Sequence, residues 1–323
     1  MATPRQYFKE VRFQQLRALV EVGRQRSFAK AAAAVHLSVP SVWQQVRALE
    51  AEFAVPLVVM RGRSVDLTDD GRLLMELAAP LVEGFDSLKA LFLDRRNRLA
   101  RQLTLATTPS LLANELRAPL KDYRRRQSEV RLTCLDRPSP AARDLLERGQ
   151  ADVAVVGMLD EAPPPALLNA TVLCSYPFML VCPKDHPLAT RARVTLTDLA
   201  GVPLVMPSED TNSRQRVDRV FAEAGLASRL TVAMSASTIG LIAGYVDLGF
   251  GVSVVSVSPQ VLEDARSGAK AYAGLIFRDL TRLFGVEHIA VLTRRGQLDL
   301  PHVAALRQML EEFLGKTEGK GSR

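Results

Sequence analysis

The chain has 323 residues, of which 47% are hydrophobic and 24% charged, and its mean hydropathy is +0.04. These values exclude a disordered chain, and the length predicts two or three compact units. The sequence contains no run of about 18 apolar residues and no apolar signal segment near its start, so we expect a cytoplasmic protein without a membrane partner.

The positive charge of the chain is concentrated near its N-terminus. The formal net charge is +7 and the sequence pI is about 9.6. Residues 1–65 hold ten Lys or Arg against four Asp or Glu, which gives +6 for this segment alone. A basic segment favours a polyanion such as DNA as the partner, although many basic proteins bind none.

Cysteine usage argues against a disulfide framework and against a structural zinc site. Cys134, Cys174 and Cys182 are odd in number and form no CxxC pair. We expect all three to be reduced and buried. A redox switch between Cys174 and Cys182 is the less favoured alternative.

In chain order, the first predicted helix spans residues 13–25. Its Phe13, Leu16 and Val20 recur at helical spacing and form one apolar face. We expect this face to pack on the apolar side of the third helix.

Residues 28–53 predict two short helices that meet at a tight turn. Ser27 and Ser38 are suitable N-caps, and Pro40 falls in the first turn of the second helix, where its missing N–H costs little. This arrangement is typical of a helix-turn-helix, although an amphipathic helix pair in an enzyme core would give a similar pattern.

The second helix of this pair is the predicted recognition helix. Its apolar residues repeat every three or four positions, which leaves an outward face of Ser, Gln and Arg side chains that suit base edges and phosphates. Trp43 either lies near the groove or packs on the wing or the support helix. The sequence RGR at residues 61–63 lies between two short strands and predicts a basic wing. The residues expected to contact DNA are Ser27, Ser38, Val39, Pro40, Ser41, Trp43, Gln44, Gln45, Arg47, Arg61 and Arg63.

Residues 69–98 predict a long helix with an apolar seam. Thr68 is its expected N-cap, and Asp69 and Asp70 suit the first turn. Pro80 is expected to kink this helix. Such a seam is typical of a dimerisation helix. It consists of Leu74, Leu77, Leu81, Leu88 and Leu91, with Phe85 beside a gap at Gly84.

Beyond residue 99 short apolar strands alternate with helices, as in parallel α/β units. The strands are predicted at 102–107, 130–135, 151–157, 171–183, 203–207, 230–234, 251–256, 273–280 and 288–295, and the helices at 110–126, 139–148, 212–224, 236–247 and 299–314. This pattern predicts two α/β lobes joined by two crossings, which suits a small ligand between them.

The order of these segments resembles that of LysR-type transcriptional regulators over almost the full length. LSVPSVWQQVRALEAEFAVPL and RGRSVDLTDDG are similar to the helix-turn-helix and wing of that family, and LLERGQADVAVVG and VDLGFGVSVVS to stretches of its effector domain. The resemblance implies a tetramer built from dimers through the linker helix, a DNA site with dyad symmetry, and a small-molecule inducer between the lobes. The chain departs from the family at Val39 and Trp43, where Gln and Ser are frequent, so base preference does not carry over.

Strand-to-helix turns, one in each lobe, supply the expected effector site. Hydroxyls and free N–H groups at a helix N-terminus suit a carboxylate, sulfate or phosphate, although a simple Ser/Thr cap would also explain the first turn. That turn looks like the one in the cysteine-metabolism regulators of the family, which favours an anionic inducer. The expected effector-binding residues are Thr107, Thr108, Ser110, Asp136, Thr211, Asn212 and Ser213.

The sequence therefore predicts an α/β protein with an N-terminal winged helix-turn-helix, a long linker helix and a two-lobed, periplasmic-binding-protein-like effector domain. The expected boundaries are 1–68, 69–98 and 99–316, with lobes 99–160 plus 273–316 and 161–272, and a disordered tail at 317–323. We expect a ligand-responsive transcriptional regulator that binds double-stranded DNA as a homodimer or homotetramer. No catalytic residue, metal site or cofactor is predicted.

Two rival functions stay open at this point. An α/β enzyme with an accessory DNA-binding domain is one, but the sequence contains no nucleophile elbow, P-loop or dinucleotide fingerprint. A ligand-independent architectural DNA binder is the other, and the turns at the expected cleft count against it.

Overall fold

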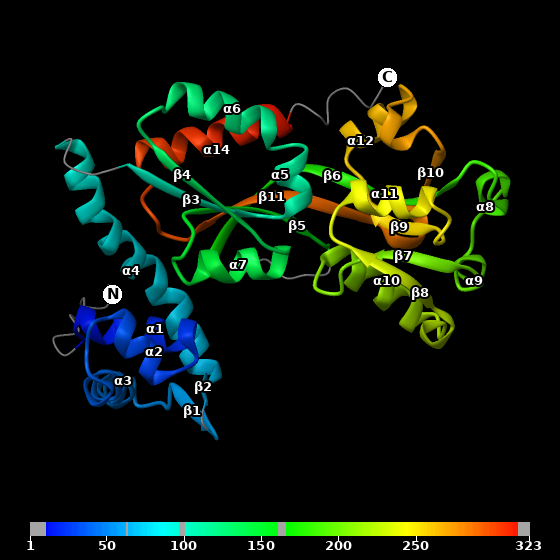
Figure 1. The fold of residues 1–323 in the computed structure, drawn as a ribbon. Coiled ribbons are helices and arrows are strands. Elements are labelled where there is room, and N and C mark those ends of the chain that lie inside the picture. The colour runs from blue at the N-terminus through cyan, green and yellow to red at the C-terminus, as the bar shows by residue number, and fades with distance from the viewer. Residues whose placement is uncertain (1–10, 63, 97–100, 161–165, 316–323) are drawn as a thin grey trace, which may run out of the picture.

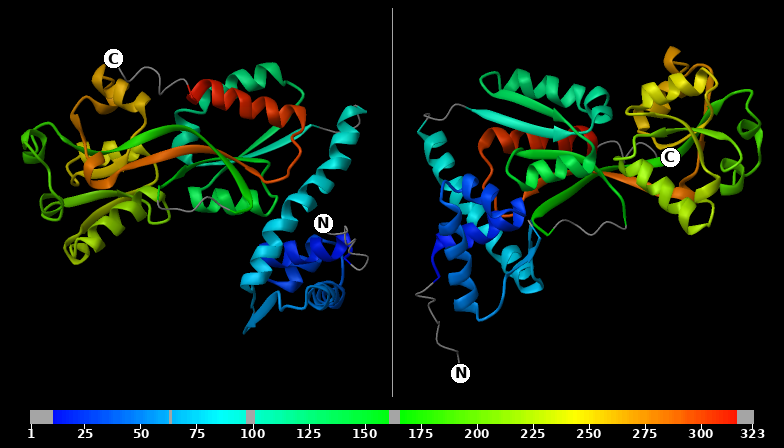
Figure 2. Two further views of the ribbon diagram at one scale, coloured as in Figure 1. Left: turned by 180° about the vertical axis from the view of Figure 1, so that it is seen from behind. Right: turned by 60° about the horizontal axis from the view of Figure 1, so that its bottom comes forward.

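The computed structural model describes residues 11–62, 64–96, 101–160 and 166–315. It consists of an N-terminal helical unit, one long helix, and an α/β domain with two lobes side by side (Figure 1). The long helix α4 extends from the N-terminal unit along the first lobe, and Figure 2 shows this from two further directions. In the described residues no helix is long and apolar enough to cross a membrane.

The N-terminal unit is a winged helix-turn-helix. Ser27 and Ser38 cap the second and third helices through their side chains, as predicted. His36 occupies the intervening turn with a φ of 56°. The elements are α1 (Phe13–Gln25), α2 (Phe28–Ala34), α3 (Val39–Phe53), β1 (Val58–Arg61) and β2 (Ser64–Leu67), the last two paired antiparallel.

The core of this unit differs from the prediction in two contacts. Val46 of α3 packs with Ala18 of α1, and Leu49 packs with Leu19. Val20 and Phe13 instead pack against α4. The prediction that they contact the third helix is therefore wrong, because the side of α1 that carries them faces the linker helix.

The linker helix α4 (Asp69–Arg95) continues past Pro80. Its N-cap is Thr68, whose hydroxyl accepts a hydrogen bond from the Gly71 N–H at 2.9 Å. One side of the helix carries six apolar residues that are each more than half exposed, and we call it the exposed stripe. The exposed stripe consists of Leu73, Leu77, Leu81, Phe85, Leu88 and Phe92.

The predicted seam overlaps this stripe but is not identical to it. Leu77, Leu81 and Leu88 are exposed, as a dimerisation seam requires. Leu74 packs into the N-terminal unit, and Leu91 is only partly exposed. The difference arises because the N-terminal unit occupies the side of α4 on which Leu74 lies.

The effector domain is built on a seven-stranded sheet in which β6 pairs with β9, β10 and β11. The elements mainly of the first lobe are β3 (Gln102–Thr107), α5 (Pro109–Ala113), α6 (Arg117–Arg126), β4 (Arg131–Asp136), α7 (Ser139–Glu147), β5 (Val153–Met158), β11 (Val286–Arg294) and α14 (Pro301–Leu314). Those of the second lobe are α8 (Pro187–Thr190), α9 (Leu196–Leu199), β7 (Pro203–Pro207), α10 (Asn212–Glu223), η1 (Ala227–Arg229), β8 (Thr231–Ala236), α11 (Ile239–Asp247), β9 (Ser253–Ser256), α12 (Pro259–Arg266), η2 (Lys270–Tyr272), β10 (Leu275–Asp279) and α13 (Thr281–Phe284).

One strand, β6 (Leu168–Pro183), runs through both lobes. The strand order is β10-β6-β11-β5-β3-β4, with β3 parallel to β4 and β5 and with β11 antiparallel to β5 and β6. The predicted parallel rhythm therefore holds for the first three strands of the domain and for β7 with β8, whereas the crossing strands are antiparallel. β10 pairs with the Met179–Pro183 end of β6 and lies in the second lobe, although the prediction put residues 273–280 in the first.

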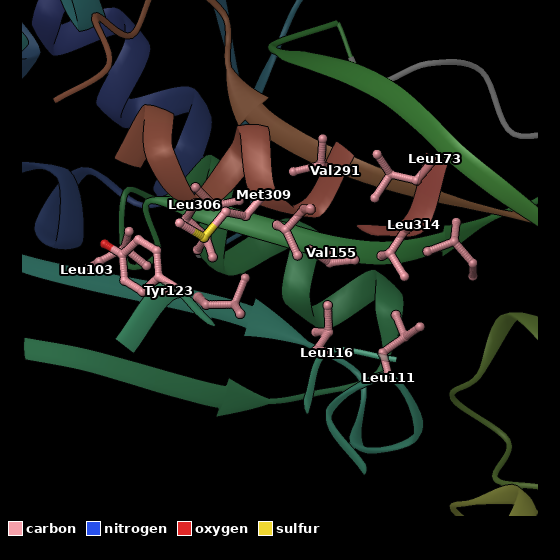
Figure 3. Close-up of a cluster of buried hydrophobic side chains, with 14 of the residues drawn as sticks. Leu103, Leu111, Leu116, Tyr123, Val155, Leu173, Val291, Leu306, Met309 and Leu314 are labelled. Carbon is pink, nitrogen blue, oxygen red and sulfur yellow. The ribbon is translucent and has the colours of Figure 1, made fainter. Parts of the chain in front are cut away.

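Each lobe has its own apolar core. In the first lobe α6 and α14 lie on one face of the sheet and α7 on the other (Figure 1). Leu103, Tyr123 and Leu306 belong to the apolar cluster between the sheet and helices α6 and α14 (Figure 3). In the second lobe the rings of Phe178 and Phe221 both stack near Phe284.

Two further expectations are corrected by the structure. The helix predicted at 110–126 is divided into α5 and α6, with the chain turning at Asn114. Cys134 is exposed rather than buried, because β4 lies at the edge of the sheet. Cys174 and Cys182 are reduced thiols that lie eight residues apart on β6, so about 26 Å of extended strand separates them and a disulfide between them is excluded.

The first lobe rests directly on the linker helix. Arg295 pairs with Glu76 at 3.4 Å, and the Leu298 N–H donates to the Ser87 hydroxyl at 3.3 Å. Gly296 has a φ of +83°, and a Cβ there would lie 2.3 Å from the carbonyl oxygen of Pro80. Only glycine permits this close approach of the two backbones.

Candidate DNA interface and effector cavity

The start of α3 is exposed and internally hydrogen-bonded. The Ser38 hydroxyl accepts from the Ser41 N–H at 3.2 Å and lies 2.7 Å from the Ser41 hydroxyl. Val39 and Pro40 are exposed beside this cap. Ser27 is partly buried and caps α2, with its hydroxyl 3.4 Å from the Lys30 N–H. The two serine caps therefore fix the angle at which α3 is presented.

Trp43 lies on the outward face of α3 and is 47% exposed. The guanidinium carbon of Arg47 lies 4.8 Å from the centre of the indole ring, which is a cation–π contact. Gln44 is exposed and Gln45 partly buried. Of the two alternatives for Trp43, the structure supports the outward one, because the wing and α1 do not cover the ring.

Glu50 connects the recognition helix to the wing, and sequence reasoning missed it. Its side chain is buried, and one carboxylate oxygen accepts from the Leu57 and Val58 N–H groups at 2.8 and 3.3 Å. The other oxygen pairs with Arg47 at 2.7 Å. The signal that could have identified Glu50 was a single acidic residue on the inward, otherwise apolar face of the helix.

The wing carries an exposed arginine. Arg61 is at the end of β1, and its Nε lies 3.3 Å from the carboxylate of Asp66 on β2. This surface ion pair leaves the guanidinium accessible, with 74% of the side chain exposed. Arg63, the second predicted wing contact, lies outside the described residues.

A cavity of about 260 Å³ lies in the cleft between the two lobes. Five helices, α5, α7, α10, α11 and α12, begin at its wall. The predicted residues that line it are Thr108, Ser110, Thr211, Asn212 and Ser213. Turns predicted separately in the two lobes are thus brought to one site.

Two predicted site residues are not at this cavity. Thr107 is fully buried at the end of β3, and among the described residues its hydroxyl has no partner. Asp136 is exposed and pairs with the adjacent Arg137 at 3.3 Å. Alternation along β3 turns Thr107 into the core and makes Thr108 the first cavity residue, while Asp136 lies at the end of the edge strand β4 and is exposed.

The threonines at the cavity already act as helix caps. The Thr211 hydroxyl donates to the Ser208 carbonyl at 2.7 Å and accepts from the Arg214 N–H at 3.2 Å. Thr108 accepts from the Leu111 N–H at 3.3 Å. These hydroxyls mainly orient the helix ends, whose first backbone N–H groups have no acceptor within the helix.

Hydrogen bonds from the second lobe to β5 and β11 lie at the same place. Asn212 donates its side-chain N–H to the Gly157 carbonyl at 2.6 Å, and the Ser213 hydroxyl donates to Glu287 at 3.1 Å. Ser256 also donates to this carboxylate. Burial raises the pKa of Glu287, and the hydroxyls and the Asn212 amide oppose the rise.

Among the cavity residues that sequence reasoning missed are Glu115, Ser139, Tyr176 and Glu287. Glu287 gave a usable signal, because it is an acidic residue that begins an apolar strand. The other three gave none, since only the topology brings the end of α5, the start of α7 and the middle of β6 together.

Comparison with known proteins agrees with this architecture. Residues 13–72 match the model of the bacterial regulatory helix-turn-helix protein, lysR family, and residues 96–315 match the LysR substrate binding domain. The HTH-type transcriptional regulator cbl of Escherichia coli is 28% identical over 298 residues, which cover 90% of this chain and 89% of that protein. The HTH-type transcriptional regulator CysB of Burkholderia cenocepacia is 27% identical, covering 94% of each.

Solved structures share the fold. The cofactor-binding domain of the Cbl transcriptional regulator superposes with a TM-score of 0.55 at 27% identity, covering 69% of this chain and 94% of that one. A mutant of the OxyR protein of Corynebacterium glutamicum gives a TM-score of 0.53 at 21% identity, covering 97% of this chain and 94% of that one.

A winged helix-turn-helix joined by a linker helix to a two-lobed domain with a cavity in its cleft, matched by these family models and relatives, is the architecture of a ligand-responsive DNA-binding transcriptional regulator. The family models match most of the chain. The protein belongs to the LysR family of bacterial transcriptional regulators.

Proposed function

We propose that a small metabolite bearing a negatively charged group binds in the cavity between the lobes and changes the affinity of the protein for its operator. The observation that carries this proposal is the convergence of helix N-termini from both lobes on one cavity of about 260 Å³. Exposed N–H groups and the helix dipole favour an anionic group there. A ligand that touches both lobes stabilises the closed cleft over the open one, and only such a difference shifts an equilibrium.

The similarity to Cbl and CysB supports a metabolite of the kind sensed by regulators of cysteine metabolism. The cavity is smaller than the roughly 300–1,000 Å³ of sites for drug-sized ligands, which also favours a small compound.

A cavity-blocking variant tests the proposal. Ser237 lines the mouth of the cavity and is exposed, so Ser237→Trp fills the entrance without disturbing a core. An operator is first selected from random duplex DNA, and a ligand is identified by thermal shift. Ser237→Trp should then abolish the effect of that ligand on operator binding and leave ligand-free affinity within about threefold. Ser267→Trp, at an exposed serine of the same lobe away from the cavity, is the control. An undiminished ligand effect in Ser237→Trp would rule the cavity out.

For DNA, we propose that the outward face of α3 enters the major groove and that the wing contacts the backbone. Exposed Trp43, Gln44 and Arg47 then lie near base edges, and Arg61 near phosphates. We also propose that the functional units end at residues 68, 98 and 316. The protein binds its DNA and its ligand in the cytoplasm.

For assembly, we propose that the exposed stripe of α4 pairs with the same stripe of a second copy. Six large apolar side chains, each 56–64% exposed along one helix, favour burial against a partner. Two such dimers would form the tetramer that the family resemblance implies.

A further inference from the structure

The charged side chains that line the cavity are all acidic. They are Glu115, Asp210 and Glu287, and no Lys, Arg or His lines the cavity among the described residues. Arg214, at the start of α10, is directed elsewhere and pairs with Asp218 at 2.9 Å. A simple inorganic anion in this cavity would therefore face carboxylates and no cationic side chain.

Glu287 is a built part of the wall and not an accidental neighbour. Its side chain is held by the Ser213 and Ser256 hydroxyls, and its other carboxylate oxygen lies over Gly157. A Cβ at position 157 would lie 1.9 Å from that oxygen, so the glycine makes room for the carboxylate.

Glu115 faces the cavity from the first lobe. It follows α5 and contacts the hydroxyl of Ser258, the N-cap of α12 in the second lobe. The Ser258 oxygen accepts from the Val261 N–H at 3.3 Å, which leaves its hydrogen free to donate to Glu115. The Glu115 carboxylate thus accepts from Ser258 and from its own backbone N–H, and it keeps further lone pairs for a ligand in the cavity that it lines.

Tyr176 presents a buried hydroxyl to the same space. Its side chain is only 6% exposed and lines the cavity. Among the described residues this hydroxyl has no hydrogen-bond partner except the nearby thiol of Cys174, which is a weak one. Buried polar groups are normally paired, so the Tyr176 oxygen points to a partner supplied by a ligand.

The remaining walls supply the complementary features. The N-termini of α7, α10, α11 and α12, helices of eight or more residues, open at the cavity and suit a carboxylate. The apolar side chains of Ile239, Ile242, Val255, Val261 and Ile289 form the rest of the lining.

We infer that the effector is a small zwitterion, an α-amino acid or close derivative with a free ammonium group and a short uncharged side chain. Its ammonium donates to Glu115 and to the Tyr176 oxygen, with Glu287 close by, and its carboxylate meets the helix N-termini. An ammonium has three donors and no acceptor, which matches an acidic wall and the oxygen of Tyr176. This inference rests on the proposed effector role of the cavity.

The test compares ligands that differ only in the amine. Calorimetry and thermal shift on the full chain are run with the standard L-amino acids, with the matching 2-hydroxy acids such as lactate and glycerate, and with inorganic sulfate. At least one amino acid should bind at millimolar concentration or below, and its hydroxy analogue should bind at least about 100-fold more weakly. Failure of every amino acid to bind, or equal binding of the hydroxy analogue, would overturn the inference.

Two variants assign the ammonium contact. Glu115→Gln and Tyr176→Phe should each weaken amino-acid binding by about tenfold or more. Glu263→Gln, at an exposed residue of α12, controls for loss of one acidic charge and should leave affinity unchanged. Wild-type affinity in both Glu115→Gln and Tyr176→Phe would also overturn the inference.

The same experiment separates this inference from the proposed function. If sulfate or a hydroxy acid binds and Ser237→Trp abolishes that binding, the cavity is an effector site for plain anions and only the zwitterion is excluded. If Ser237→Trp alters no binding event, both proposals fail.

Discussion

The Glu83 carboxylate of the linker helix accepts a hydrogen bond from Nε of Arg294, on β11 of the first lobe, at 2.9 Å, and both side chains are about nine-tenths buried. The other Glu83 oxygen pairs with Arg24 of α1. Arg294 also donates to the carbonyls of Leu146 and Ala151 at 3.0 and 2.6 Å. One buried carboxylate therefore joins the DNA-binding unit, the linker and the effector domain of a single chain.

Removal of Glu83 should destabilise the junction strongly. Glu83→Gln leaves the buried Arg294 without its counter-charge and Arg24 with Glu21 alone, and a broken buried pair costs about 3–5 kcal/mol. Glu76→Gln breaks the more exposed pair with Arg295 and should cost under about 1 kcal/mol. Urea denaturation followed by circular dichroism measures both, and equal midpoints for the two variants would contradict the buried role of Glu83.

Glu287 should make stability depend on pH in a defined direction. Because burial raises its pKa in the folded state above the usual 4.5, its contribution to stability is fully present below that value and is lost as the pH rises through the folded pKa. Glu287→Gln cannot ionise and keeps the size of the side chain. The Tm of Glu287→Gln relative to wild type should therefore increase from pH 4.5 upward.

The control for this measurement is Glu263→Gln, which removes an exposed carboxylate from α12. Its Tm difference from wild type should stay constant across the same range. If the Tm difference between Glu287→Gln and wild type also stays constant with pH, folding does not raise the pKa of Glu287.

Replacement of Thr107 by valine and replacement of Thr108 by valine should have opposite effects on stability. Thr107→Val replaces a buried, unpaired hydroxyl by a methyl group of similar size and should stabilise the protein by about 1 kcal/mol without affecting ligand binding. Thr108→Val removes the cap of α5 and should cost about 1 kcal/mol and weaken ligand binding. Thermal denaturation and calorimetry on both variants decide between them. Loss of ligand binding in Thr107→Val alone would restore the assignment made from sequence.

The exposed stripe should be required for assembly. Leu81→Asp combined with Leu88→Asp puts two charges in the proposed interface and should give monomers in analytical ultracentrifugation. Leu248→Asp, at another exposed leucine distant from α4, tests whether an added surface charge alone has this effect. A double mutant that sediments like wild type would place the contact elsewhere.

The wing arginines should affect DNA affinity without affecting specificity. Arg61→Ala with Arg63→Ala removes two phosphate contacts, so the slope of log K against log salt should fall by roughly one to two units on every DNA sequence. Arg229→Ala, at an exposed residue of the second lobe, is the control for lost positive charge. A slope that matches wild type would refute the wing contact.

The sequence was most informative where local chemistry decides the structure. Ser27, Ser38 and Thr68 cap the helices as predicted, because an N-cap depends on residues only three positions apart. Thr107 was wrongly assigned to the cavity because side chains alternate between the two faces of a strand. The face on which Thr107 lies therefore depends on the residue at which the strand ends.

Long-range pairing was beyond single-sequence reasoning. Nothing in the chain indicates that Glu115 meets Ser258 or that Arg24 meets Glu83, because each contact depends on how separate units pack. Trp43 was undecided for the same reason, since its exposure depends on whether a neighbouring element covers it.

The crossings between the lobes are strands paired with each other and not free loops. Tyr176 lies opposite Glu287 and Pro177 opposite Val286 in one antiparallel ladder, with a register shift just beyond, between Ile289 and Ala290. Rotation of one lobe against the other must therefore twist this ladder, which resists large angles. We expect the radius of gyration from solution scattering to change little when a ligand binds, while amide hydrogen exchange slows at Tyr176 and Glu287. Signal transmission in this protein would then be a small torsion of two strands.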